Sequence, residues 1–250
     1  MGLHRRLSAG VLMVGCAVMM VATACSRPPV DSELRAKAQG ADAQRKRDSE
    51  EAHIRGLLAP FSHVEGLHPG YTMFEDRCGK APEGNIFEPA RGPLLTCSMS
   101  GHAVFGVEGE VADVLRRIDA AHIAKWQPNV NGPGSASGGS MDYALMYQRM
   151  RGVEPDGQLM SAPYLESVNE DVKIAWDAVP HGTAPPLYQV EGKETPACPP
   201  ESVVYSRCDI TPQRPEAVPS IRARYGTVLE VDVQPPLSDG TYFEVPRPRS

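Results

Sequence analysis

Several motifs that carry well-known chemistry are missing from this chain. It has no Gly-Lys-Ser/Thr ending for a phosphate-binding loop, no His-Glu-x-x-His for a zinc hydrolase, and no Gly-x-Ser-x-Gly or Ser-x-x-Lys for an activated serine. The Cys-x-x-Cys pairs of structural zinc sites and the alternating Asp/Asn residues of a calcium loop are absent too. We therefore assign no catalytic, metal-binding or cofactor-binding residue from the sequence, and we expect no nucleotide or cofactor.

Positive charge and long apolar runs are also scarce. Beyond residue 25 no apolar segment approaches the roughly 20 residues that a membrane-spanning helix needs. Without residues 1–24 the chain loses Arg5 and Arg6, which leaves 23 Lys and Arg against 31 Asp and Glu and a net charge of −8. Such an acidic chain argues against nucleic acid as a partner.

The first 25 residues have the pattern of an export signal. Basic residues at positions 4–6 precede a mostly apolar run over 7–21, and Ala22-Thr23-Ala24-Cys25 follows. This ending resembles the lipobox of bacterial lipoproteins, although position 22 there is more often Leu or Val. The resemblance implies cleavage after Ala24, a lipid on Cys25, and a protein anchored at the extracytoplasmic face of the cell membrane.

Two alternatives to this anchor remain open. Ordinary cleavage near Ala24 would leave a soluble secreted protein, and a second candidate ending at Cys16 would have a very short apolar core. The high Ala, Pro, Gly and Arg usage is similar to that of uncharacterised secreted lipoproteins of actinobacteria. That likeness is one of composition and transfers no function.

Four further cysteines, Cys78, Cys97, Cys198 and Cys208, are an even number in an exported chain and predict two disulfides. Of the three connectivities we favour Cys78 with Cys97 and Cys198 with Cys208, because short loops close most easily. A link from Cys78 to Cys198 would instead tie the two halves of the chain together. A four-cysteine metal site is the competing interpretation.

The pattern of elements predicts an α+β fold with a mostly antiparallel sheet. Residues 31–58 are charged and Ala-rich with few apolar positions, which favours a solvated helical stalk that docks only at its end. Spacings of three and four over 110–125 predict one strong amphipathic helix packed on the sheet, with His122 on its apolar stripe. Strands are expected at the following ranges: 71–74, 94–98, 102–107, 143–150, 171–176, 203–210, 227–233 and 242–245.

These elements suggest three regions: a signal peptide over 1–24, a lipid anchor and stalk over 25–59, and a disulfide-stapled domain over 60–250. The Gly- and Ser-rich stretch 129–140 predicts a loop inside one domain or a linker between two lobes, 60–126 and 143–250. Asp239-Gly240 predicts a hairpin turn between the last two strands.

Function follows only in outline. We expect a membrane-anchored binding or envelope-support module with no enzymatic activity, held by its lipid, with an envelope protein or glycan as partner. The alternative is a cell-envelope hydrolase whose site is assembled from scattered acids and histidines. The meeting of His63, His102 or His181 with an acid in a cleft would favour the hydrolase. The two tryptophans, Trp126 and Trp176, either fill the core or line a groove.

Overall fold

A computed structural model describes residues 30–80, 92–128, 140–169, 171–181, 186–192, 196–198, 204–234 and 241–247. The described elements are α1 Asp31–Ala38, α2 Ala41–Leu58, a 3₁₀ turn Ala59–His63, β1 Leu67–Lys80, β2 Leu95–Val107, α3 Val111–Ala120, α4 Met141–Met150, β3 Tyr164–Glu166, β4 Val172–Trp176, β5 Tyr205–Thr211, α5 Val218–Tyr225, β6 Thr227–Val233 and β7 Thr241–Val245. Within these ranges no helix has the length and apolar character needed to cross a membrane.

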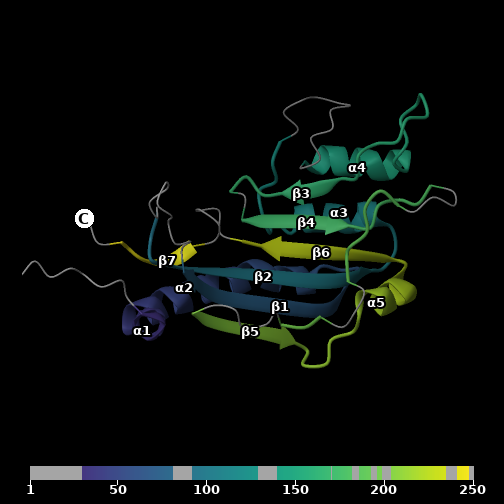
Figure 1. Cartoon of the computed structure of the whole chain (residues 1–250). Helices are drawn as coiled ribbons and strands as arrows, with labels where there is room; N and C mark the ends of the chain where they lie inside the picture. The colour runs from purple at the N-terminus through teal and green to yellow at the C-terminus, as the bar shows by residue number, and fades with distance from the viewer. Residues whose placement is uncertain are drawn as a thin grey trace, which may run out of the picture.

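The strands form a seven-stranded sheet in the order β3-β4-β6-β2-β1-β5, and β7 pairs with β2 (Figure 1). Every neighbouring pair is antiparallel. The expected α+β fold with an antiparallel sheet is therefore confirmed. The expected runs at 94–98 and 102–107 are parts of one long strand, β2, which pairs along its length with β1.

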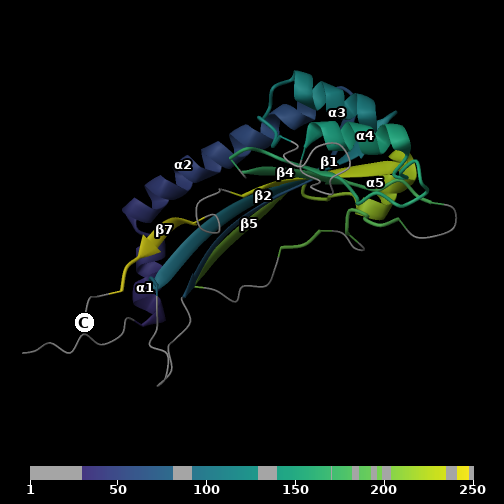
Figure 2. The same cartoon turned by 90° about the horizontal axis from the view of Figure 1, so that it is seen from above.

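Alternation along β6 shows how the sheet divides its two faces. Leu229, Val231 and Val233 are buried in the main core, against residues of α2 and α3. Val228 packs in a separate cluster with Val218 and Ile221 of α5. Figure 2 shows α2 running along one face of the curved sheet, with α5 on the other side.

The segment 31–58 is helical and its end docks as expected, through Ile54 and Leu58, but the prediction that the rest is a solvated stalk is wrong. The buried positions of the segment lie against the sheet: Leu34, Ala38, Ala43, Arg47, Ile54 and Leu58. Small alanines allow close approach at one end, and Arg47 is buried because it pairs with Asp76 of β1. Packing therefore does not need the continuous apolar stripe on which the stalk prediction depended.

The expected helix over 110–125 is shorter in the structure. As α3 it ends at Ala120, and His122 adopts a left-handed backbone with φ of 51°. Its apolar stripe is buried as expected, through Val111, Val114, Leu115 and Ile118. His122 is exposed beyond the helix and does not belong to that stripe.

The strand predicted at 143–150 is wrong, because this segment is the helix α4. The Ser140 hydroxyl caps it by accepting the backbone N–H of Tyr143 at 3.3 Å. Tyr143, Ala144 and Tyr147 form its buried face. Short runs of Tyr and Met fit both periods, so the apolar pattern alone could not separate helix from strand.

The two segments that were considered as possible lobes share one sheet. β1 and β2 come from residues 60–126 and the other strands from 143–250, so no lobe boundary divides the described chain. The turn at 239–240 lies outside the described residues. The expected hairpin is nevertheless wrong, because β6 and β7 both pair with β2, along residues 101–107 and 95–98, and not with each other.

Both favoured disulfides are present. Cys78 and Cys97 are directly opposite each other on β1 and β2, and Cys198 is joined to Cys208 of β5. The first bond is buried beneath α1, in a cluster with Leu34 and Ala38. Cys25 and the linker residues 129–139 lie outside the described residues, and the lipid on Cys25 stays a prediction.

Candidate functional site

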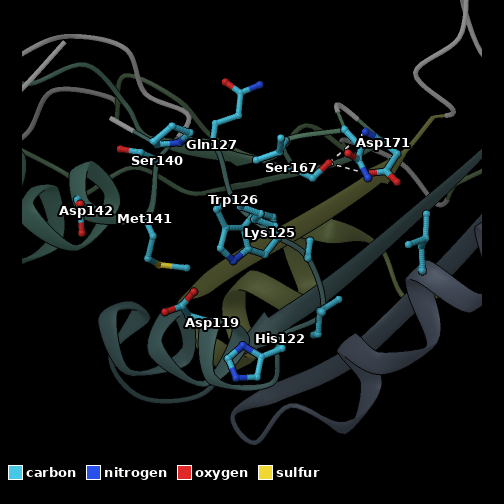
Figure 3. Close-up of a pocket in the computed structure, with 16 residues that line it drawn as sticks. Asp119, His122, Lys125, Trp126, Gln127, Ser140, Met141, Asp142, Ser167 and Asp171 are labelled. Carbon is cyan, nitrogen blue, oxygen red and sulfur yellow. Dashed lines mark hydrogen bonds between the residues drawn. The ribbon is translucent and has the colours of Figure 1, made fainter. Parts of the chain in front are cut away.

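A cleft of about 850 Å³ opens between the end of α3 and the start of α4 (Figure 3). It is lined by Leu57, Asp119, residues 122–128, residues 140–142, residues 167–169 and Asp171. Pockets for small ligands usually measure about 300–1,000 Å³. The cleft therefore has room for a small ligand.

Part of the lining is built by two extended segments that meet beside β3. Trp126 and Ser167 form an isolated antiparallel bridge. The N–H of Gln127 donates to the carbonyl of Glu166 at 2.8 Å, and the N–H of Val168 donates to the carbonyl of Lys125 at 2.7 Å. These bonds hold the Trp126 backbone in place on the cleft wall.

The Trp126 indole is the most unusual group in the cleft. Its side chain belongs to the main core and the residue is only 8% exposed, yet its Nε1–H has no hydrogen-bond partner within the described ranges. A buried donor left unpaired costs about 1–3 kcal/mol relative to a paired one. In Figure 3 this ring lies between His122 and Asp119 on one side and Ser167 on the other.

Charge in the cleft is mostly negative, from Asp119, Asp142 and Asp171, with Lys125 as its basic residue. Such a lining suits ligands that donate hydrogen bonds and disfavours anions. The Ser167 hydroxyl donates to Asp171 Oδ1 at 2.5 Å and accepts the backbone N–H groups of residues 171 and 172. This serine is thus committed to a turn and is not an activated nucleophile.

Of His63, His102 and His181, only His102 has an acidic side-chain partner among the described residues, as the hydrolase alternative would require. His63 is exposed. His181 Nε2 is buried and has no hydrogen-bond partner in the described chain. His102 Nδ1 lies 2.7 Å from Asp232 Oδ1, but neither residue lines the cleft of Figure 3.

His102 and Asp232 belong to a second polar cluster, on the face of the sheet away from α2. Glu230 and Asp232 are two residues apart on β6 and therefore lie on the same face. His102 of β2 is opposite Asp232. The Tyr188 hydroxyl donates to Glu230 Oε1. A cavity of about 1080 Å³, lined by Tyr188, Glu230 and Arg222 among others, adjoins this cluster.

Burial and neighbouring charges shift the pKa values of the groups in this cluster. Burial and the charge of Asp232 raise the pKa of Glu230 above its ordinary value, against the hydrogen bond from Tyr188. Burial lowers the pKa of His102, but the hydrogen bond to Asp232 and the charges of both carboxylates outweigh it and raise the pKa. Burial and Glu230 also raise the pKa of Tyr188.

Sequence reasoning located parts of these sites without assembling them. Trp126 was expected either to fill the core or to line a groove, and it does both. Glu230 and Asp232 lie within the strand predicted at 227–233, and neither was assigned a role from the sequence. Polar side chains recurring every second residue in an otherwise apolar strand were the available signal.

Comparisons with protein families, curated proteins and solved structures found no match. What the protein does has to follow from its own geometry.

Proposed function

We propose that this protein is a lipid-anchored, extracytoplasmic binding protein that holds a polar, hydroxyl-rich ligand, such as a cell-envelope glycan fragment, in the cleft beside Trp126. The observation that carries the proposal is that Trp126 lines this cleft and that its buried indole N–H has no hydrogen-bond partner among the described residues. A ligand oxygen that accepts this N–H relieves an unsatisfied buried donor. Ligand hydroxyls in turn donate to the aspartates of the lining.

The proposed location is supported by the disulfides and by the leader. Disulfides persist in oxidising compartments, which fits an exported chain. Lipidation at Cys25 would hold the chain at the membrane without a spanning helix, provided that more than one acyl chain is attached.

The hydrolase stays as a second candidate because His102 and Asp232 form the pair that a general base needs. Nucleophilic catalysis also requires a hydroxyl or thiol within hydrogen-bonding reach of the imidazole. In the described part of the chain no serine, threonine or cysteine side chain is hydrogen-bonded to His102. This geometry favours binding over nucleophilic hydrolysis.

A fluorescence titration with soluble cell-wall glycan fragments tests the binding function. We expect saturable binding that changes tryptophan emission in the wild type and in Trp176→Phe, whose buried indole lies outside the cleft. Trp126→Phe retains an aromatic ring but lacks the N–H, so binding should weaken roughly tenfold. Absence of binding, or equal binding by both variants, would contradict the proposal. Shortened fragments in the same mixture would support the hydrolase.

Membrane fractionation tests the anchor. Cys25→Ala should move the protein from the membrane to the soluble fraction, because the lipid would have no attachment point. Cys16→Ala is the matched control, since it removes the other leader cysteine and should leave retention unchanged. Membrane retention of Cys25→Ala would overturn the assignment of the anchor.

A further inference from the structure

The paired strands β2 and β6 bring three metal-ligating side chains together. Glu230 and Asp232 are two residues apart on β6 and therefore project to the same face of the sheet. His102 is directly opposite Asp232, and Val104 is opposite Glu230. One ligand atom from each of His102, Glu230 and Asp232 lies within 4.8 Å of the other two.

We propose that His102, Glu230 and Asp232 form a binding site for a divalent first-row transition-metal ion. An imidazole with two carboxylates is a mixed nitrogen and oxygen donor set. Imidazole suits zinc and its neighbours, whereas magnesium and calcium prefer oxygen donors alone. Three protein ligands also leave coordination positions for water or for an external ligand.

The charge balance of the cluster supports a cation. Two carboxylates lie close together in a partly buried site, and among the described residues neither forms an ion pair with lysine or arginine. Lys173 of β4 is opposite Asp232 of β6, but its Nζ lies 4.9 Å from the centre of the Tyr164 ring. A divalent ion would replace the repulsion between the carboxylates with attraction to both.

Neighbouring groups hold the ligands in place while leaving the site accessible. Tyr188 donates to Glu230, the kind of outer hydrogen bond that orients a metal-binding carboxylate. The His102 side chain is 22% exposed and that of Asp232 is 44% exposed, so an ion can enter from solution. The site lies on the opposite face of the sheet from α2 and does not depend on the glycan-binding proposal.

Zinc titration of the full chain tests the site. The protein is expressed with its own leader, kept oxidised so that the disulfides stay closed, and stripped with a chelator. Zn²⁺ is then titrated by calorimetry and by competition with a chromophoric chelator. We expect one saturable equivalent, and we expect His102→Ala and Asp232→Asn each to weaken binding by at least about 100-fold, because a direct ligand is lost.

Two further variants make the result specific. His68→Ala removes a histidine that contacts Glu108 Oε2 at 2.5 Å outside the proposed site, and it should leave zinc affinity unchanged. Tyr188→Phe keeps all three ligands and should weaken binding about tenfold by releasing the Glu230 carboxylate. It also gives a readout if the ligand variants fail to fold. Absence of saturable binding, full affinity in His102→Ala, or an equal loss in His68→Ala would overturn the proposal.

Discussion

Arg47 of α2 and Asp76 of β1 form an ion pair in the protein interior, with Arg47 Nε 2.5 Å from Asp76 Oδ2 and side-chain exposures of 1% and 0%. Arg47 also donates to the carbonyl of Ala38 at 3.0 Å, and Tyr242 donates to Asp76 Oδ1 at 2.6 Å. The guanidinium lies over the Tyr205 ring, 4.3 Å from its centre. A charged helix is thus joined to the sheet through a buried, hydrogen-bonded network.

Asp76→Asn should be strongly destabilising, because it leaves Arg47 buried without a counter-charge. Loss of one partner of a buried pair costs about 3–5 kcal/mol in the free energy of unfolding. Asp42→Asn is the matched control, because Asp42 pairs with Arg45 where both side chains are more than half exposed. That change should cost less than about 1 kcal/mol. Urea unfolding followed by circular dichroism compares the two, and equal losses would contradict the buried network.

The ionisation of Glu51 should make the free energy of unfolding depend on pH. Burial of Glu51 raises its pKa, but hydrogen bonds from Arg207 and Arg55 outweigh burial and lower it below the ordinary 4.5. A carboxylate with a lowered pKa in the folded state stabilises the fold above its unfolded pKa and loses this effect as pH falls through the folded pKa. Wild type should therefore exceed Glu51→Gln in unfolding free energy at neutral pH, with the gap closing below about pH 4.5. Urea unfolding across pH measures this, and a pH-independent gap would refute it.

The sheet was largely predictable because the alternation of residues within each short strand indicates which side chains are buried. For β6 the predicted range, 227–233, is the range that the structure has, because successive residues of a strand alternate between its two faces and leave this pattern in the sequence. Both disulfides were also favoured, because short loops close most easily. These predictions needed only information contained within short segments.

The candidate sites and the helix packing depend on distant partners and were not predictable in this way. Asp76 is 29 residues from Arg47, and Asp232 is 130 residues from His102. Nothing local to Arg47 indicates burial, because a charged residue enters a core only when the fold supplies its partner. The helix α4 differs from these cases, because Ser140, which caps it, is only three residues from Tyr143 and was a better guide than the Tyr and Met pattern that follows.

Close packing of α2 on β2 gives the last prediction. A Cβ added at Gly101 would lie 2.6 Å from Ile54 Cγ2 and 2.7 Å from Leu58 Cδ1, whereas one at Gly79 would meet nothing within 4 Å. Gly101→Ala should therefore lower the unfolding free energy by about 1–3 kcal/mol through overpacking. Gly79→Ala should be neutral or stabilise by up to about 1 kcal/mol.

The variant Ile54→Ala tests whether contact with α2 causes the destabilisation expected of Gly101→Ala. In the Gly101→Ala/Ile54→Ala double variant the truncated side chain makes room for the new methyl, so the combined loss measured by urea unfolding should be smaller than the sum of the single losses. A helix that stood away from the sheet would show no such coupling, and Gly101→Ala would then cost no more than Gly79→Ala. The experiment therefore separates a docked helix from a solvated stalk by free energy.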